Sequence, residues 1–169
     1  AVDVGVIEVG LGGLLDCTNV ITPEVAAVSL IGLDHTAILG HTLEEIAAQK
    51  GGIYKPGVPA LTVDQDPKVI ETLRQCAQRV GAPFHVVGKD IDSTYRFEFV
   101  GPERRPQARI ELTTEHSNFE HVPVPLPGEH QAQNCGLALA IIDALTERGF
   151  QCPTDRAVAG LATTKIPGR

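Results

Sequence analysis

Short apolar runs alternate with helical segments through the first half of the chain, and this alternation is the strongest constraint on its fold. Thr42–Gln49 begins with a capping-box pair, Thr42 and Glu45, and a second helical segment opens at Asp66-Pro67 and runs to Val80. Runs rich in β-branched and other apolar residues predict four strands, at Val4–Val9, Val25–Leu30, Pro59–Val63 and Phe84–Val87. Strands that alternate with helices predict a parallel sheet with helices packed on its faces.

The pattern changes near Ser93, where short alternating runs replace the helices. These runs predict an antiparallel meander of three strands: Tyr95–Val100, Gln107–Thr113 and Phe119–Val124. Helical sequence returns at Glu129–Arg148, and a last short helix runs from Pro153 or Thr154 to about Ala162. The predicted fold class is therefore α/β, a mostly parallel sheet flanked by helices, with a small antiparallel β meander.

Length, composition and charge are those of one globular domain. The 169 residues are 43% hydrophobic and 21% charged, and the net charge is −7. An acidic chain without a basic stripe argues against nucleic acid as a partner, and no apolar run reaches the ~20 residues of a membrane span.

The four cysteines show no CxxC spacing, which favours reduced thiols in a cytoplasmic protein. The chain begins Ala-Val-Asp-Val and contains no methionine, so we expect an excised fragment.

A carboxylate followed by a glycine-rich turn forms the first candidate site. Glu8 closes the first predicted strand, and an acid at this end of a buried strand is where open α/β sheets place their chemistry. Three glycines and a group of polar side chains follow it: Gly10, Gly12 and Gly13, then Asp16, Thr18 and Asn19. The turn is not a dinucleotide fingerprint, because Leu15 holds the third glycine position, and the chain contains no GxxxxGK[ST] phosphate loop.

Two other segments place polar side chains near the ends of predicted elements. Asp34 and His35 follow the second predicted strand, and Lys50 follows the first predicted helix. Taken singly, Asp34 can be a turn or cap residue and His35 a surface histidine. Lys50 can be a cation that complements the helix dipole. The residues alone leave these interpretations open.

Taken together, the segments resemble the Mur ligase superfamily, and most closely its folate branch of folylpolyglutamate synthases and bifunctional dihydrofolate synthases. The similar runs are EVGLGGLLDCTN at 8–19, IGLDHTAILGHTLEEIAAQKGGIYKPGVP at 31–59 and GEHQAQN at 128–134. The terminal Pro167-Gly168-Arg169 is similar to the family's linker into its C-terminal domain. Three positions depart from residues common in the family, and none of them is an implied ligand: Leu14, Cys17 and Gly51.

The resemblance implies that residues 1–169 are a partial Mur ligase-like central ATPase domain. It places a phosphate-loop segment upstream of Ala1 and a glutamate-binding domain downstream of Arg169. Because no phosphate loop is present, we expect the fragment alone to be inactive. The missing phosphate-loop strand is also expected to expose a sheet edge, through which the fragment can self-associate.

The resemblance also implies a mechanism and a set of site residues. Family members use ATP to convert a carboxylate into an acyl phosphate, which an amine then attacks to form an amide. Mg²⁺, or Mn²⁺, offsets the repulsion between the reacting anions. By resemblance, Glu8, His35 and Lys50 bind the metal, Lys50 as a carbamylated lysine, and Lys50 and His35 are the catalytic residues. The implied nucleotide-binding residues are Asn134, Gln131 and Arg169.

The implied substrates are ATP, L-glutamate and either folate or dihydropteroate. Two alternatives remain open, a Mur-type ligase for peptidoglycan precursors and a non-catalytic module that keeps the ligase fold. The run of glycines and polar residues directly after Glu8 favours the folate branch over the first alternative. An intact phosphate loop in the upstream gene sequence would count against the second.

Overall fold

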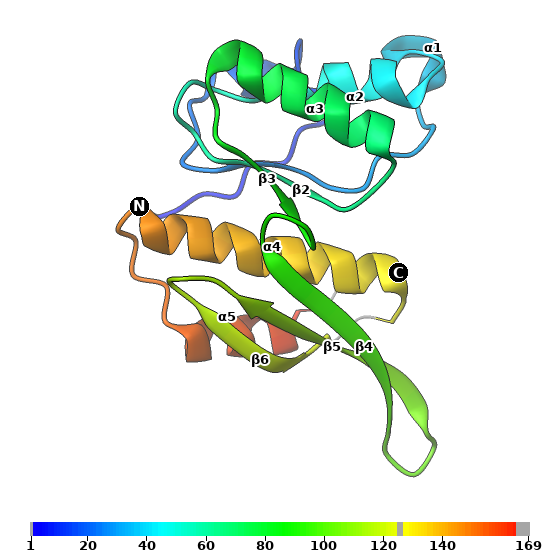
Figure 1. The fold of residues 1–169 in the computed structure, drawn as a ribbon, viewed down its shortest axis with the longest axis vertical. Helices are drawn as coiled ribbons and strands as arrows, with labels where there is room; N and C mark the ends of the chain where they lie inside the picture. The colour runs from blue at the N-terminus through cyan, green and yellow to red at the C-terminus, as the bar shows by residue number, and fades with distance from the viewer. Residues whose placement is uncertain (1, 125–126, 165–169) are drawn as a thin grey trace. The chain divides into compact units, whose positions relative to one another are not determined.

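The computed structural model describes residues 2–124 and 127–164, and the chain divides into two compact units. The first unit comprises Ala1–Ala60 and Gln65–Phe84, and the second comprises Leu61–Asp64 and His85–Arg169. The elements of the first half are η1 (Cys17–Val20), β1 (Ala26–Val28), α1 (Thr36–Leu39), α2 (Leu43–Gly51), β2 (Ala60–Val63), α3 (Pro67–Val80) and β3 (Phe84–Val87) (Figure 1). Those of the second half are β4 (Asp92–Val100), β5 (Arg105–Thr113), β6 (Asn118–Pro123), α4 (Glu129–Glu147) and α5 (Thr154–Ala162).

The strands form two three-stranded sheets within the described part of the chain. The first has the order β1-β2-β3 and is parallel. The amide of Ala60 donates to the carbonyl of Pro83 at one end of the β2–β3 pair, and the amide of Asp64 donates to Val87 at the other. The second sheet, β4-β5-β6, is an antiparallel meander. The predicted α/β class, with a parallel sheet, flanking helices and a meander, is confirmed.

Helix α3 shows how local sequence positions an element of the first unit. Asp66 caps its start by accepting a hydrogen bond from the amide of Lys68, and Pro67 occupies the first turn, where no amide donor is needed. The helix ends at Gly81, whose φ of 72° lies in the left-handed region that glycine adopts freely. Ile70 is buried on this helix, and four neighbouring apolar positions are part of the core of the first unit: Val69, Leu73, Cys76 and Ala77. These boundaries match the sequence prediction.

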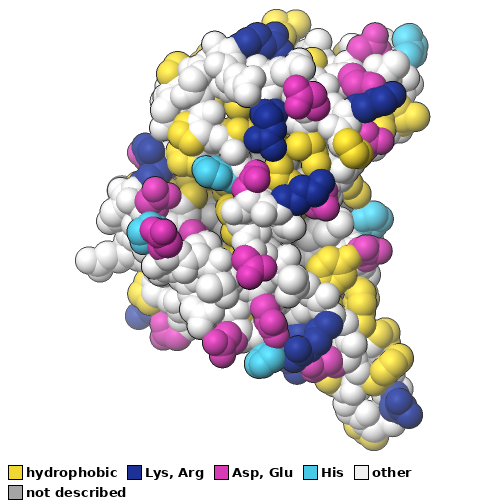
Figure 2. All heavy atoms as spheres, in the orientation of Figure 1, with side chains coloured by type: hydrophobic (Ala, Val, Ile, Leu, Met, Phe, Trp, Pro, Cys, Tyr) yellow, Lys and Arg dark blue, Asp and Glu magenta, His cyan; other side chains and the backbone are white. Residues whose placement is uncertain are grey.

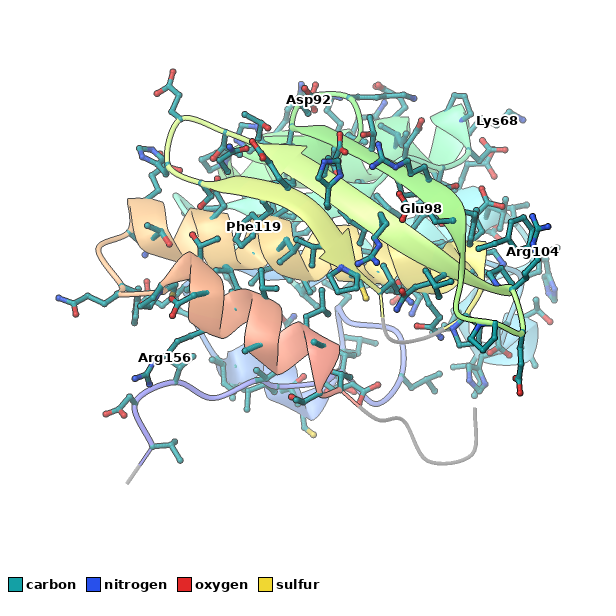
Figure 3. All side chains as sticks on the ribbon, turned by 90° about the horizontal axis from the view of Figure 1, so that it is seen from below. Lys68, Asp92, Glu98, Arg104, Phe119 and Arg156 are labelled. Atoms are coloured by element: carbon teal, nitrogen blue, oxygen red, sulfur yellow. The ribbon has the colours of Figure 1, made fainter. Side chains whose placement is uncertain are left out.

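In the second unit, α4 packs against the meander. Alternate side chains of β5 are buried, and helix α4 contacts both β4 and β5. Phe119 on β6, labelled in Figure 3, is the largest fully buried side chain among the described residues and is 1% exposed. On β4, Glu98 accepts hydrogen bonds from the Arg96 and Arg109 guanidinium groups, which lower the pKa of its carboxyl. Arg104 lies in the turn between β4 and β5, also labelled in Figure 3.

The prediction of a strand over Val4–Val9 is wrong. The segment forms no strand in the structure, and its apolar side chains face solvent, with Val6 96% exposed. A β-branched run becomes a strand only when a neighbouring strand takes its backbone hydrogen bonds, and no described strand pairs with this one. The predicted second strand, Val25–Leu30, is confirmed only in part, because the observed β1 is three residues long.

Figure 2 shows acidic and basic groups interspersed on the visible face of the described residues. Helices with the length and apolar character of a bilayer span do not occur in residues 2–124 and 127–164. The four cysteines are all unpaired thiols, two of them buried.

Candidate active site

The segment Gly10–Asn19, here called the glycine loop, is held together by the carboxylate of Asp16. Its Oδ2 accepts a hydrogen bond from the amide of Leu11 at 3.2 Å. Its Oδ1 accepts one from the amide of Thr18 at 2.9 Å and another from the Thr18 hydroxyl at 2.7 Å. The hydrogen bonds from Thr18, followed by that from Leu11, lower the pKa of Asp16 to about 2. Asp16 and Thr18 thus order this loop.

The glycine loop lies against the end of helix α2 through nearly direct backbone contact. The amide of Leu14 donates to the carbonyl of Gln49 at 2.8 Å. A Cβ added at Gly13 would lie 2.8 Å from that same carbonyl oxygen and 3.0 Å from the carbonyl oxygen of Lys50. A Cβ added at Gly52 would lie 2.5 Å from the Cβ of Leu14. Both glycines are therefore required by close approach, not by an unusual φ angle.

Asn19 and Lys55 join the other end of the loop to the same region. The side-chain amide of Asn19 donates to the carbonyl oxygens of Leu14 and Gly52, at 2.9 and 3.2 Å. The ammonium of Lys55 in turn donates to the side-chain and main-chain oxygens of Asn19, at 2.6 and 3.0 Å. Lys55 has no sequence signal for this role except its place just after the helix that carries Lys50.

The hydrogen bonds of Asp16 lead to a prediction about acid stability. Because the pKa of about 2 in the folded chain lies below the ordinary aspartate pKa of 3.8, the ionised carboxylate favours the folded state. That contribution is complete above about pH 4 and is lost as the pH falls through 2. We therefore expect Asp16→Asn to lower the urea midpoint at pH 7, and the difference from wild type to shrink between pH 4 and 2.

Asp3→Asn is the matched control for Asp16→Asn, since its exposed carboxylate accepts no hydrogen bond from the described residues. Its urea midpoint should follow wild type at every pH. A constant difference between Asp16→Asn and wild type down to pH 2 would show that ionisation of Asp16 does not stabilise the loop.

The implied metal-binding residues occupy three places in the first unit. Glu8 is exposed in the extended segment just before the glycine loop, and Lys50 is half-buried in the last turn of α2. Contact between the glycine loop and that turn brings the Glu8 motif and the Lys50 motif together. However, no hydrogen bond or ion pair among the described residues joins Glu8 to Lys50 or His35. Nor do His, Cys, Asp and Glu side chains in the described ranges gather in threes to hold a metal ion. Metal binding by Glu8, His35 and Lys50 therefore stays a prediction.

His35 lies at the start of α1 with an unusual backbone. Its φ of 50° is in the left-handed region, which is costly for a residue with a Cβ. Its amide donates to the carboxylate of Asp34 at 2.7 Å, and its Nε2 lies 3.6 Å from the other oxygen of that carboxylate. Asp34 thus holds the exposed imidazole from one side. Asp34 therefore lies in the turn before α1 and does not cap the helix, and a ligand role for His35 stays untested.

The implied nucleotide-binding residues lie on α4 in the second unit. Asn134 is exposed and Gln131 is half-buried on the first turns of the helix. Both side chains carry amide groups that can donate and accept hydrogen bonds. Arg169 lies outside the described residues, so its implied role remains a prediction.

A parallel sheet with flanking helices, a glycine loop behind an exposed acid and an added meander define an α/β domain. The chain belongs to the Mur ligase middle domain family, whose model matches residues 1–142. Relatives include the mitochondrial folylpolyglutamate synthase of Homo sapiens, 38% identical over 99% of this chain and 29% of that protein. Another is the dihydrofolate synthase/folylpolyglutamate synthase of Bacillus subtilis, 35% identical over 99% of this chain and 38% of that protein.

Solved structures of proteins named FPGS have the same fold as this chain. The apo form of L. casei FPGS superposes with a TM-score of 0.87 at 30% identity, over 99% of this chain and 40% of that one. An FPGS–AMPPCP–folate complex gives a TM-score of 0.84 at 29% identity, over 96% of this chain and 39% of that one. The chain therefore spans well under half the length of the proteins it resembles.

Proposed function

We propose that this chain is the central ATPase domain of an ATP-dependent ligase that adds L-glutamate to folate or dihydropteroate. The observation that supports this most strongly is the likeness to folylpolyglutamate and dihydrofolate synthases along 99% of the chain. A solved structure of one such protein holds both AMPPCP, an analogue of ATP, and folate. The glycine loop, which follows Glu8, contacts the last turn of α2, which carries Lys50. This contact is consistent with one site built from both motifs.

The reaction proposed has two steps. The substrate carboxylate attacks the γ-phosphorus of ATP, forming an acyl phosphate and releasing ADP. The amine of L-glutamate then attacks the acyl carbon, forming an amide and releasing phosphate. Both steps bring anions together, so positioning and charge compensation supply most of the catalysis. Asn134 and Gln131 are proposed to hold the nucleotide through their side-chain amides.

Glu8, His35 and Lys50 are the residues proposed to hold Mg²⁺, or Mn²⁺, with Lys50 carbamylated. The donor chemistry fits in one respect, since the Glu8 carboxylate is exposed and Mg²⁺ prefers oxygen ligands. A bound divalent ion would compensate the charge of the phosphates. The Lys50 ammonium cannot coordinate a cation, whereas a carbamate on the same nitrogen supplies oxygen donors. The left-handed backbone of His35 fixes the direction in which its imidazole leaves α1.

The proposal extends to location and self-association. Four unpaired cysteines are typical of a reducing compartment, which supports a cytoplasmic location. The extended segment before the glycine loop exposes Val4, Val6 and Ile7, by 51%, 96% and 58%. An unpaired apolar segment of this kind favours association between copies of the isolated chain through strand pairing.

Substrate profiling of the full gene product that contains this chain tests the proposed activity. With ATP and L-glutamate, we expect amide formation on dihydropteroate or a reduced folate, measured by release of ADP and by mass spectrometry of the product. UDP-linked peptidoglycan precursors should not react. Ligation of UDP-linked substrates without ligation of either pteroate would replace the folate assignment with a Mur-type one. Absence of any ATP-dependent ligation would favour a non-catalytic module. The 169-residue chain alone should show no ATP turnover.

A further inference from the structure

Strand β4 is a free edge of the meander. The sheet order is β4-β5-β6, and within residues 2–124 and 127–164 β4 pairs with β5 alone. Figure 1 shows the far end of the β4–β5 hairpin extending beyond helix α4. The backbone amide and carbonyl groups along the outer side of an edge strand can pair with a further strand.

One face of β4 carries a stripe of exposed aromatic rings. Tyr95, Phe97 and Phe99 alternate along the strand and are 36%, 49% and 65% exposed. Their neighbours across the β4–β5 pair include Ile110 and Ala108, which are both buried. The stripe therefore continues the core face of the meander to the edge that no described element covers. An apolar stripe of this kind on a strand indicates an interaction surface.

Contacts within the chain already order these rings. The rings of Tyr95 and Phe97 pack edge to face, with their centres 6.0 Å apart. The Tyr95 hydroxyl donates to Glu129 at 2.5 Å, and the guanidinium carbon of Arg104 lies 5.4 Å from the centre of the Phe99 ring. Side chains that are held in place before association lose less entropy when a partner binds.

The other face of β4 carries two charges of opposite sign. Arg96 Nε donates to Glu98 Oε1 at 3.0 Å, and Glu98 Oε2 accepts from Arg109 Nε at 3.2 Å. Arg96 also donates to Glu111 at 3.3 Å, so acids and bases alternate across this face. Charges on an edge strand usually prevent another strand from pairing with it. Opposite charges two residues apart do not prevent it when the incoming strand is antiparallel and has the same sequence.

The sequence of β4 is complementary to itself. With a two-fold axis at Phe97, Arg96 of each copy lies opposite Glu98 of the other, and each Tyr95 lies opposite a Phe99. A two-fold axis at Arg96 would instead place two arginines opposite each other, and one at Glu98 would place two glutamates so. Charge therefore distinguishes the register centred on Phe97 from the registers on either side of it.

We propose that β4 is a homodimer interface, which pairs antiparallel with the β4 strand of a second copy about a two-fold axis at Phe97. The two meanders then form one continuous antiparallel sheet. The aromatic stripes of both copies meet on one face, and the pair of Arg96 with Glu98 occurs twice on the other. The proposal does not depend on the ligase activity, and the strand is distinct from the extended segment before the glycine loop.

Sedimentation velocity of the full gene product that contains this chain, over a range of concentrations, tests the dimer. We expect a concentration-dependent shift from monomer to dimer. Arg96→Glu and Glu98→Arg should each raise the dimer Kd at least about tenfold, because each places like charges opposite one another twice. An equimolar mixture of the two variants should restore the dimer. In the mixed pair, both positions are acidic in one copy and basic in the other.

Two exposed positions away from β4 supply the matched controls. Arg156→Glu on α5 and Glu120→Arg on β6 make the same two charge changes, and Glu120→Arg does so on the opposite edge of the meander. Both should leave the dimer Kd unchanged. Thermal unfolding of each variant shows whether the fold is retained.

Oxidative cross-linking tests the register and supplies the result if a charge variant does not fold. Phe97→Cys should form a disulfide with its own copy, because position 97 faces itself across the two-fold axis. Phe99→Cys, on the same face of the same strand, should not, since the two copies of position 99 lie beyond the reach of about 7 Å between Cα atoms. Wild type, which has the exposed Cys17, gives the background.

A monomer at every concentration, no recovery of the dimer in the mixture, or equal cross-linking of Phe99→Cys would each overturn the proposal. A dimer of the 169-residue chain together with a monomeric full gene product would overturn it as well. That result would show that another part of the gene product covers β4.

Discussion

Gly52→Ala should lower the free energy of unfolding of this chain by about 2–3 kcal/mol, because the new methyl group has no space. The added Cβ would lie 2.5 Å from the Cβ and 2.7 Å from the Cα of Leu14. A Cα cannot move aside as a flexible side-chain end can. The glycine loop must therefore shift away from α2 and weaken the hydrogen bond from Leu14 to Gln49.

Urea unfolding followed by circular dichroism measures this effect. Gly10→Ala is the matched control in the same loop, since its Cβ would meet only Asp16 Oδ2 at an ordinary 3.5 Å. That substitution should be neutral, or slightly stabilising through the lower entropy of the unfolded chain. Equal midpoints for Gly52→Ala and Gly10→Ala would show that the close backbone contact does not exist in solution.

Gly13→Ala probes the contact from the loop side. Its Cβ would meet the carbonyl oxygens of Gln49 and Lys50. Because Gly13→Ala and Gly52→Ala both displace the loop from α2, their combined loss should be smaller than the sum of the single losses. Simple additivity would mean that the two glycines act at independent contacts.

Glu8→Gln should lower kcat/KM for ligation by the full gene product at least about 100-fold. Glutamine has the size of glutamate but lacks the negative charge that holds a divalent cation. The exposed Glu8 carboxylate accepts no hydrogen bond in the described part of the chain, so the fold should not change. Thermal unfolding of the 169-residue chain should confirm an unchanged Tm.

Asp3→Asn is the control for Glu8→Gln, since it removes one negative charge from the same exposed segment. Its ligation kinetics should match wild type within about twofold. If Glu8→Gln retained near-normal activity, Glu8 would have no place in the metal site, although the folate assignment could still stand on the substrate profile.

Elements defined by local signals could be predicted from the sequence. The cap at Asp66, Pro67 and the stop at Gly81 fix α3, and the capping box of Thr42 and Glu45 is observed at α2. The prediction of a strand over Val4–Val9 is wrong because strand formation depends on a neighbouring strand, which the local sequence pattern does not specify. Helix α1 was missed because it has four residues and no side-chain cap.

The same distinction applies to the candidate site. The role of Asp16 is local, since its partners lie within five residues, and it could be predicted. The hydrogen bonds of Lys55 with Asn19 span 36 residues, and their existence depends on how the loop meets α2. The left-handed backbone of His35 could not be predicted, because only a few per cent of non-glycine residues adopt it, although histidine is enriched among them.

The two glycines at the contact between the glycine loop and the end of α2 limit which segments can be exchanged between related proteins. Gly13 and Gly52 come from two motifs about 40 residues apart, yet each leaves room for the backbone of the other motif. A glycine loop taken from a relative carries side chains of other sizes, so it will fit only a helix end that has matching space. Chimeras in this family should therefore exchange residues 8–19 and 42–55 together, because either segment alone carries half of one interface.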